Sequence, residues 1–316
     1  MKVLITGSSG ALGSLITRSL VEKKIPVTGI DINGDHENIS PECFRFYKCC
    51  ITNRSKLESI FLKEEPTHVI HFACSFNKIR NRQKEYQVDI VGSRNILEIS
   101  DKTPSVRQLI FSSSAAAYGG NSGNSPWISE YHPLRPGNYR YGINKGLIEE
   151  IYLKTPVRED LNLNLVRICT VIGPAINKKG SVVSILLKMP WLPEFCRDNK
   201  LQFLHSDDFV SLINHMIPDD QIKGVFNIAP NSFSPLTELL PDKKFKRIPV
   251  FLVSACLSVL WHLKLVDIQP AGIDISIYPI LLSPEKIVKR FNYKFKFTST
   301  EAFENTITNS ILRSGN

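Results

Sequence analysis

The sequence lacks any CxxC motif, and its seven cysteines are an odd number in a chain of 316 residues. A disulfide framework depends on cysteines that pair, so a small disulfide-stabilised secreted domain is not expected. We predict reduced thiols in a cytoplasmic protein without a metal site, at positions Cys43, Cys49, Cys50, Cys74, Cys169, Cys196 and Cys256.

Long hydrophobic runs are also missing. The longest apolar stretch, Val250 to Trp261, is too short to cross a bilayer, which takes about 20 residues. Met1 and Lys2 run directly into the apolar residues that begin at Val3, which leaves no room for a signal peptide. We therefore expect neither a membrane-spanning helix nor secretion.

Low-complexity segments and internal repeats are absent as well. The formal net charge is +9, but the lysines and arginines are scattered, without a basic patch interleaved with aromatic residues. A nucleic-acid partner is thus not expected, whereas a small anionic ligand suits the net charge. With 42% hydrophobic residues, the chain can bury the core of one large domain or of a domain with a smaller appendage.

A glycine-rich turn opens the chain. The apolar run Lys2 to Thr6 leads into GSSGALG, residues 7–13, after which apolar residues recur at helical spacing. In this order of strand, glycine turn and helix, Gly7 and Gly10 have no side chain to keep a pyrophosphate from the helix N-terminus. Gly13 lets the helix pack close to the strand.

A second apolar strand, Pro26 to Ile30, ends at Asp31. A carboxylate at this place can accept both ribose hydroxyls of adenosine and would repel a 2′-phosphate. No arginine lies beside it. The pattern therefore predicts binding of NAD in preference to NADP.

Beyond Asp31, strand-like and helical segments alternate, which predicts a parallel sheet. We expect an α/β fold: a Rossmann-type doubly wound parallel sheet with helices on both faces and a smaller C-terminal substrate domain. Residues 1–172 form the NAD-binding domain, to which the chain returns at about 201–229; residues 173–200 and 230–316 form the substrate-binding part. The expected strands are 43–47, 68–72, 107–112 and 161–168, and the expected helices are 54–63, about 84–100 and about 139–154.

Tyr141 and Lys145 lie four residues apart in YGINK, a spacing that puts both side chains on one face of a helix. A free tyrosine has a pKa of about 10 and is a poor base near neutrality. A cation held nearby favours the phenolate, so the pair can donate and accept a proton in an alcohol/ketone conversion. The spacing alone is equally typical of a solvated helix face.

Three serines, residues 112–114, end the strand that begins at Arg107. Ligands of open parallel sheets gather at the carboxyl ends of the strands, where a neutral hydroxyl can donate to a substrate oxygen. Loop-filling serines are the alternative. His71 ends another strand, and we expect it to be structural rather than catalytic.

Taken in order, seven motifs resemble those of the extended short-chain dehydrogenase/reductase family, especially its NAD-dependent epimerase/dehydratase branch, which includes the UDP-hexose 4-epimerases. They cover residues 1 to about 230 and are TGSSGALG, Asp31, VIHFA, FSSSAAAYGG, YGINK, RICTVIGP and FLHSDDF.

The resemblance implies an NAD-dependent enzyme with Ser114, Tyr141 and Lys145 as catalytic residues. Tyr141 would shuttle the proton, Lys145 would lower its pKa and hold the nicotinamide ribose, and Ser114 would orient the substrate oxygen. A homodimer built by the helices near 84–100 and 139–154 is also implied. The cofactor contacts that we carry over come from Gly7, Gly10, Ala11, Leu12, Gly13, Asp31, Ile51, Phe72, Ala73, Tyr141 and Lys145.

Four positions depart from the family's pattern. Cys50 replaces the usual aspartate after the third strand, and Asp89 stands where asparagine is common. Thr170 replaces an asparagine that contacts the nucleotide-sugar diphosphate in many relatives, which counts against a nucleotide sugar. The alanines 115–116 replace the Asp-Glu pair of sugar 4,6-dehydratases, so dehydration is not expected.

Three functions follow as alternatives. The leading one is an NAD-dependent epimerase or 4-keto reductase that acts on a nucleotide-activated sugar. The second is an NAD-dependent dehydrogenase of a hydrophobic secondary alcohol, similar to hydroxysteroid dehydrogenases, which Thr170 and the apolar segment 249–263 suggest. The third is a non-catalytic NAD-sensing protein, which the joint presence of Ser114, Tyr141 and Lys145 disfavours.

The apolar segment 249–263 directly follows a basic stretch. We expect it to be a buried packing helix. A helix that caps an apolar pocket or makes peripheral contact with a membrane is the less favoured alternative. The basic residues are Lys243, Lys244, Lys246 and Arg247.

Overall fold

The computed structural model describes residues 1–34, 42–76, 79–176, 181–266 and 269–314. The chain divides into two compact units. Unit 1 comprises Met1–Ser113, Asn144–Val166 and Val210–Phe226, and unit 2 comprises Ser114–Ile143, Arg167–Phe209 and Asn227–Asn316. Within the predicted substrate-binding part, residues 177–180, 267–268 and 315–316 lie outside the described residues.

Unit 1 is built on a sheet of seven strands in the order β11-β6-β5-β4-β1-β2-β3. The strands from β5 to β3 pair in parallel, and Thr6 of β1 lies opposite Ile30 of β2 and His71 of β4. Strand numbers rise outward on both sides of β1, which is the order of a doubly wound sheet and confirms the predicted Rossmann-type fold. The strands are β1 (Val3–Thr6), β2 (Val27–Asp31), β3 (Phe44–Lys48), β4 (His68–His71), β5 (Gln108–Ser114), β6 (Asn162–Ile168) and β11 (Gly224–Ile228).

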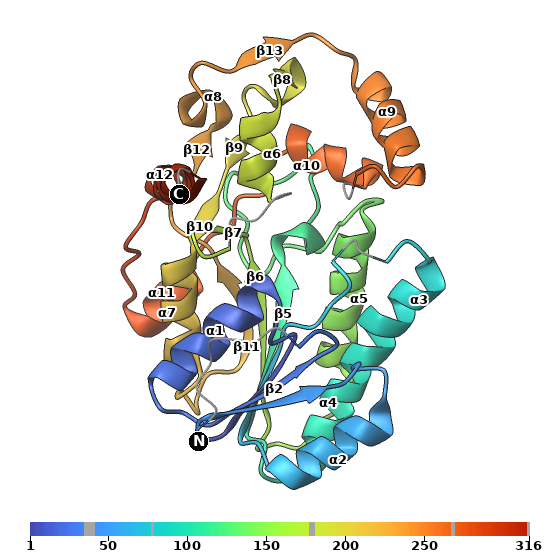
Figure 1. Cartoon of the computed structure of the whole chain (residues 1–316), viewed down its shortest axis with the longest axis vertical. Coiled ribbons are helices and arrows are strands. Elements are labelled where there is room, and N and C mark those ends of the chain that lie inside the picture. The colour runs from blue at the N-terminus through green and yellow to red at the C-terminus, as the bar shows by residue number, and fades with distance from the viewer. Residues whose placement is uncertain (35–41, 77–78, 177–180, 267–268, 315–316) are drawn as a thin grey trace. The chain divides into compact units, whose positions relative to one another are not determined.

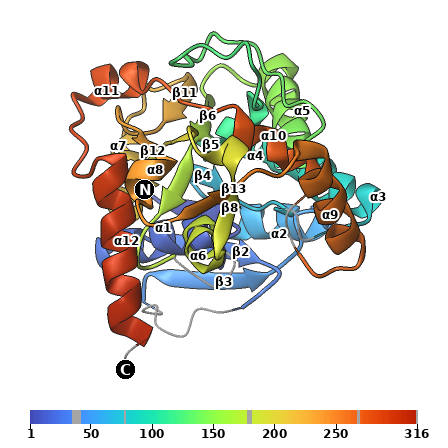
Figure 2. The same cartoon turned by 90° about the horizontal axis from the view of Figure 1, so that it is seen from above.

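Helices cover both faces of this sheet, with α1 and α7 on one face and α2, α4 and α5 on the other (Figures 1 and 2). The predicted long helix near 84–100 consists of three consecutive segments: α3 (Arg82–Tyr86), a π-helical turn (Gln87–Val91) and α4 (Gly92–Lys102). The other helices are α1 (Ala11–Glu22), α2 (Arg54–Glu64), α5 (Arg140–Lys154) and α7 (Ser206–Met216).

The apolar spacing of these helices determines the face that they bury. Leu57, Ile60 and Phe61 recur at helical spacing along α2, and all three are buried in one core with residues of β4, β5, α4 and α5. In the same core, the rings of Phe111 and Tyr152 lie with their centroids 4.9 Å apart. Full burial of one such side chain contributes about 1.5–3 kcal/mol, so this core holds α5 firmly on β5.

Unit 2 contains mostly shorter elements. Its strands form three two-stranded sheets, β10-β7, β12-β9 and β13-β8. A second core joins β7, β10, α6, α8 and α12 through residues such as Ile172, Phe203 and Phe303. The bounds are β7 (Thr170–Ile172), α6 (Val182–Lys188), β8 (Trp191–Pro193), β9 (Lys200–Leu201), β10 (Phe203–His205), β12 (Ser234–Pro235), α8 (Leu236–Leu239), β13 (Lys244–Lys246), α9 (Val250–His262), α10 (Ile273–Ile277), α11 (Glu285–Phe291) and α12 (Ser299–Ser314), with 3₁₀ turns at Ala115–Ala117, Glu194–Cys196 and Pro270–Gly272.

The apolar segment 249–263 forms α9, but the expectation of a buried packing helix is wrong. Trp261 is the one buried residue of this helix. Among the residues that the structure describes, no helix is long and apolar enough to cross a membrane. All seven cysteines are free thiols.

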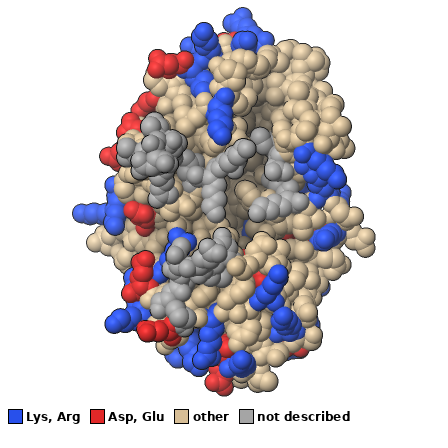
Figure 3. Space-filling model, in the orientation of Figure 1, with Lys and Arg blue, Asp and Glu red and all other residues tan. Residues whose placement is uncertain are grey.

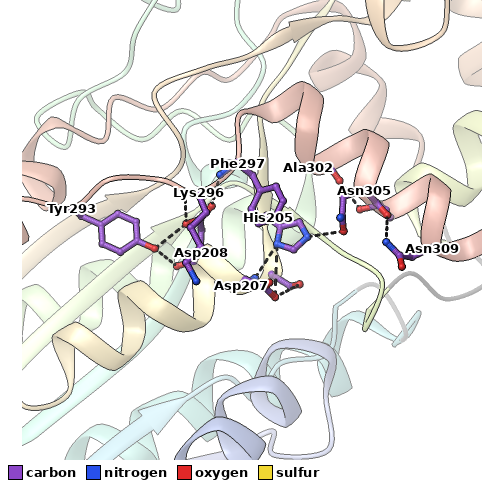
Figure 4. Close-up of polar contacts among 11 residues, drawn as sticks. His205, Asp207, Asp208, Tyr293, Lys296, Phe297, Ala302, Asn305 and Asn309 are labelled. Carbon is purple, nitrogen blue, oxygen red and sulfur yellow. Dashed lines mark hydrogen bonds and ion pairs between the residues drawn. The ribbon is translucent and has the colours of Figure 1, made fainter.

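The FLHSDDF segment fastens the C-terminal part of unit 2 through Asp208, whose side chain is fully buried. Its carboxylate accepts hydrogen bonds from the Tyr293 hydroxyl (2.9 Å) and from the backbone amides of Lys296 (2.9 Å) and Phe297 (3.1 Å) (Figure 4). The ring of Phe297 in turn stacks on His205, with 3.9 Å between the ring centroids. Asp208 thus holds residues 293–297, the segment before α12, in place through hydrogen bonds. The sequence pattern did not predict this structural role.

We predict that Asp208→Ala lowers the free energy of unfolding by about 3 kcal/mol, because buried donors lose a charged acceptor. Urea unfolding followed by circular dichroism measures this as a lower midpoint. Asp207→Ala is the matched control, since the side chain of Asp207 is 63% exposed and we expect little change there. Equal midpoints for the two variants would show that Asp208 does not hold the C-terminal segment.

Candidate active site

The glycine turn lies between β1 and α1, and its backbone leaves no room for side chains. Gly7 has φ +73°, and a Cβ atom there would lie 2.7 Å from the amide nitrogen of Ala73. A Cβ atom on Gly13 would lie 2.1 Å from the carbonyl oxygen of Gly7. Two predicted glycine roles therefore have a steric basis: a left-handed turn at Gly7 and close packing of α1 at Gly13.

The N-terminus of α1 has the properties of an anion site. Gly10 is its N-cap and supplies no side-chain cap, and the first turn contains no acidic residue. Gly10 and Ala11, the N-cap and the first residue of the helix, are both exposed. Backbone N–H groups at such a terminus attract phosphate, so the turn fits the pyrophosphate of a dinucleotide.

Asp31 ends β2 next to this turn. One carboxylate oxygen accepts a hydrogen bond from the amide of Ser9 (3.0 Å), and the other accepts one from the amide of Asn33 (3.0 Å). Each oxygen has a second lone pair, so the carboxylate can still accept from a diol. The half-buried side chain is thereby oriented beside the glycine turn, as an adenosine-binding role requires.

Other predicted cofactor residues follow neighbouring strands of the same sheet. Ile51, which comes after β3, is buried and lies against α4, where a Cβ atom on Gly92 would meet its side chain at 2.6 Å. Phe72 and Ala73 follow β4, and the backbone at both residues closely approaches Gly7. Leu12 in α1 is half-buried.

The three serines at the end of β5 have different surroundings. Ser113 is buried, and its hydroxyl donates to the buried carboxylate of Glu149 on α5. Ser114 is half-buried, and its oxygen accepts a hydrogen bond from the amide of Ala116 (3.2 Å). An accepting hydroxyl keeps its hydrogen for donation, so Ser114 can donate to a substrate oxygen.

Helix α5 carries Tyr141 and Lys145 one turn apart, at a point where the chain passes from unit 2 to unit 1. Lys145 is 3% exposed, and its ammonium donates to the carbonyl oxygen of Ser112 (2.5 Å). The ammonium also lies 4.9 Å from the centroid of the Phe111 ring. Within unit 1, Lys145 is therefore fixed at the carboxyl end of β5, where ligands of doubly wound sheets gather.

The start of α5 packs tightly within unit 2. A Cβ atom on Gly142 would lie 2.3 Å from the carbonyl oxygen of Ala116. Ala116 belongs to the 3₁₀ turn that Ser114 caps, so the segment bearing Tyr141 touches the segment that follows Ser114. Tyr141 itself is half-buried, and its ring centroid lies 5.9 Å from that of Tyr139.

A buried carboxylate at Asp89 orders the residue before Lys145. Asp89 lies in the π-helical turn and accepts hydrogen bonds from the amide (2.7 Å) and hydroxyl (2.8 Å) of Ser75 and from the side-chain amide of Asn144 (3.0 Å). The sequence comparison marked Asp89 only as a departure from asparagine. A carboxylate here can accept from all three donors at once, so it suits these neighbours.

His71 is a structural residue rather than an acid or base. The ring is buried between the hydroxyls of Thr6 (2.6 Å) and Ser93 (2.8 Å). Burial, together with the nearby charge of Lys145, lowers the pKa of His71 to about 3. The imidazole is consequently neutral at pH 7.

A doubly wound sheet with a glycine turn after β1 and an acidic residue at the end of β2 defines a dinucleotide-binding protein. The sequence pattern of the NAD dependent epimerase/dehydratase family matches residues 3–229. The chain belongs to this family, the branch of the extended short-chain dehydrogenase/reductases that the motifs predict.

Two curated relatives match parts of the chain. Protein CapI of Staphylococcus aureus is 32% identical over 149 residues, which are 42% of this chain and 44% of that protein. A putative UDP-glucose 4-epimerase of Methanocaldococcus jannaschii is 30% identical over 193 residues, 58% of this chain and 61% of that protein. The chain thus spans about half the length of the curated relatives that it matches.

Two solved structures share the fold over nearly the whole chain. The Bordetella bronchiseptica enzyme WbmG, in complex with NAD and UDP, has a TM-score of 0.77 at 21% identity and covers 99% of this chain and 96% of its own. A UDP-glucose 4-epimerase of Thermotoga maritima, with UDP-glucose, has a TM-score of 0.75 at 24% identity and covers 99% of this chain and 100% of its own.

Proposed function

We propose that the protein is an NAD-dependent epimerase or 4-keto reductase that acts on a nucleotide-activated sugar. The observation that carries the proposal is the setting of α5: Lys145 is buried at the end of β5, Tyr141 lies one turn earlier, and Gly142 packs onto the turn capped by Ser114. The relatives named as UDP-glucose 4-epimerases and the WbmG structure with UDP favour a nucleotide sugar.

The cofactor is held by residues around the glycine turn. The N-terminus of α1, with Gly7, Gly10 and Gly13, takes the pyrophosphate, and Asp31 accepts the adenosine ribose hydroxyls. Ile51, Phe72 and Ala73 line the adenosine side, with Ala11 and Leu12 at the start of the helix. NAD, when bound, supplies the hydride acceptor and donor that a sugar oxidation and its reversal need.

The chain's own residues handle the proton. Tyr141 takes the proton from the sugar hydroxyl and returns it when the ketone is reduced. The charge of Lys145 favours the phenolate form of Tyr141, and its ammonium, held at the end of β5 by the carbonyl oxygen of Ser112, orients the nicotinamide ribose. Ser114 donates its hydrogen to the same sugar oxygen, and this hydrogen bond keeps that oxygen in position for proton transfer with Tyr141.

The neighbourhood of Ser114 also limits the reaction. The two residues that follow it, Ala115 and Ala116, form a 3₁₀ turn without a carboxylate. Elimination of water from a keto sugar needs an acid and a base near the departing hydroxyl. We infer that the protein stops at epimerisation or reduction, and that unit 2, which contains the exposed Thr170 at the start of β7, binds the nucleotide sugar.

Asp31→Ser should weaken NAD binding roughly tenfold and reduce the preference for NAD over NADP. The ribose loses a charged acceptor with two oxygens, and a 2′-phosphate is no longer repelled. Isothermal titration with each cofactor gives the two dissociation constants and their ratio. Asn33→Ala is the control for the loop, since it keeps the backbone amide that Asp31 accepts. A weaker affinity with an unchanged NAD/NADP ratio would assign Asp31 to turn geometry alone.

The substrate class is tested with a panel of UDP- and dTDP-hexoses. An epimerase yields the 4-epimer without net NADH, whereas a keto-reductase consumes NADH on the 4-keto sugar. Net NADH formation from a hydrophobic secondary alcohol, with silence on every sugar, would instead favour the dehydrogenase alternative. NAD binding without turnover on sugars, alcohols and ketones would favour the NAD-sensing alternative.

A homodimer is the further element of this proposal. Helices α4 and α5 border a surface hollow lined by Arg94, Glu98, Glu150 and Ile151, and α5 exposes Leu147 and Leu153. Charged and apolar groups side by side suit a helix-on-helix contact with a second copy. Light scattering should give the mass of two 35.7 kDa chains, and a single-chain mass would exclude the dimer.

A further inference from the structure

Helix α9 of unit 2 is apolar on all sides, yet the protein covers only part of it. Its sequence VFLVSACLSVLWH contains no charged residue apart from a terminal histidine. A helix of this composition normally lies in a protein core or a membrane. Large side chains of α9 and the turn after it are instead exposed: Phe251 is 70% exposed, Leu252 49%, Val259 58%, Leu263 62% and Leu265 68%.

Apart from Val250 at the first position, which is 36% exposed, the covered and exposed large side chains lie on opposite faces of the helix. At about 100° per residue, Phe251, Leu252, Val259 and Leu263 fall within an arc of about 140°. Ala255 and Cys256 fill the same arc and are also exposed. The opposite arc contains the buried Trp261 and the half-buried Val253, Leu257 and Leu260, which face the rest of the unit. We call the exposed arc, with Leu265, the apolar face of α9.

Basic residues flank the apolar face. Residues 243–264 contain four lysines and one arginine, and no aspartate or glutamate. Lys244 and Lys246 are exposed on β13, before the helix, and Lys264 is exposed just after it. In Figure 3, the area over α9 at the upper right is free of red and blue, and blue side chains gather at the top near β13.

Three of these cations are partly engaged within unit 2. The ammonium of Lys243 donates to the carbonyl oxygens of Leu187 (3.2 Å) and Met189 (2.9 Å). Arg247 pairs with Glu194 (2.9 Å), although its side chain is 90% exposed. The ammonium of Lys246 lies 5.0 Å from the centroid of the Trp191 ring, although the residue is exposed. The charge available to a partner is therefore carried chiefly by Lys244 and Lys264, with Lys246 as an exposed third cation.

We propose that the apolar face of α9 docks on an anionic membrane surface, with the flanking lysines on the lipid headgroups. A segment with apolar residues on one side and lysines at both ends is suited to the interface between acyl chains and headgroups. With 13 residues, α9 is about 20 Å long, so it lies on the bilayer rather than crossing it.

A second copy of the chain fits this surface less well. A two-fold contact through α9 would bring the lysines of one copy close to those of the other, which is repulsive. Anionic headgroups supply the opposite charge, and acyl chains supply a cover without polar groups that need partners. The charge pattern therefore selects the lipid surface.

The experiment is flotation of the full chain with phosphatidylcholine vesicles, with and without phosphatidylglycerol. We expect the wild type to float with the anionic vesicles and to be released by high salt. Phe251→Ser combined with Leu252→Ser should lower the partition coefficient roughly tenfold, because apolar area is lost from the bilayer. Leu62→Ser is the matched control, since Leu62 is 80% exposed on α2 and should have no effect.

A second pair of variants tests the lysines. Lys244→Glu with Lys246→Glu should also lower the partition coefficient roughly tenfold or more, since each cation near the surface contributes to binding. Lys102→Glu with Lys223→Glu gives the same net charge from exposed sites in unit 1 and should retain binding.

Three results would overturn the proposal. The first is no flotation of the wild type. The second is equal loss in the two lysine pairs, which would mean attraction by net charge alone. The third is a change of native mass in light scattering when Phe251 and Leu252 are replaced, which would mean that a second copy covers α9. Unchanged melting temperatures establish that the variants are folded.

Discussion

Tyr141→Phe should abolish turnover while leaving NAD binding nearly intact. The variant removes one oxygen and retains the ring, so the packing of the half-buried side chain changes little. The lost hydroxyl is the group that we assign to proton transfer, and removal of a positioned acid and base costs roughly a thousandfold in kcat. NAD affinity depends chiefly on the glycine turn and Asp31 and is expected to stay within a factor of about three.

The neighbouring tyrosine provides the control for this prediction. Tyr139 belongs to the same segment, and its ring lies against that of Tyr141. Tyr139→Phe also removes one phenol oxygen, two residues before the predicted catalytic tyrosine, and should leave most of the turnover. The assignment is wrong if Tyr141→Phe retains substantial activity on the substrate that the sugar panel identifies.

Lys145→Ala should damage both turnover and NAD binding. Its ammonium is buried and donates to the carbonyl oxygen of Ser112, so it is held at the end of β5, where the ligands of doubly wound sheets gather. Without it, Tyr141 loses the nearby cation that favours the phenolate, and the nicotinamide ribose loses a donor. We expect kcat to fall roughly a thousandfold and NAD affinity to fall roughly tenfold.

Lys154→Ala tests whether any lysine of α5 gives the same result. Lys154 is exposed near the end of the same helix and pairs with Glu150 (2.6 Å), an interaction of small energetic value at an exposed site. Titration with NAD and initial-rate kinetics separate the two effects. A Lys145→Ala protein that is folded and binds NAD as tightly as the wild type would remove Lys145 from the cofactor site.

The nucleotide-binding half of the fold was predictable because its constraints are local. Gly7 adopts a positive φ and Gly13 packs against the turn after β1, and both positions require glycine. The alternation of apolar strands and amphipathic helices is also a local pattern, and it indicates the parallel sheet. The interruption of the helix near Asp89 by a π-helical turn has no comparable local signal.

Contacts between residues that are far apart in the chain could not be predicted from the sequence. Ser75, Asp89 and Asn144 meet only because α3, α4 and α5 are folded on one face, and no spacing rule links them. Glu149 could have been found, since it lies four residues after Lys145 on the same helical face. The Ser113 hydroxyl donates its hydrogen to Glu149. The neighbouring Ser114 accepts a hydrogen bond instead and keeps its hydrogen for a substrate.

The failure at α9 has a different physical origin. The apolar sequence of α9 predicts that the helix is shielded from water, but it does not identify the surface that shields it. A position in the protein core was the simpler prediction. The exposed Phe251 and Val259 show that the chain itself supplies only one side.

The central claim is most directly tested by the melting temperature of the purified protein with added ligands. We expect NAD to raise the melting temperature more than an equal concentration of NADP does, and a UDP- or dTDP-hexose to raise it further in the presence of NAD. No shift with NAD, or a nucleotide sugar that adds nothing to the NAD shift across the whole panel, would contradict it.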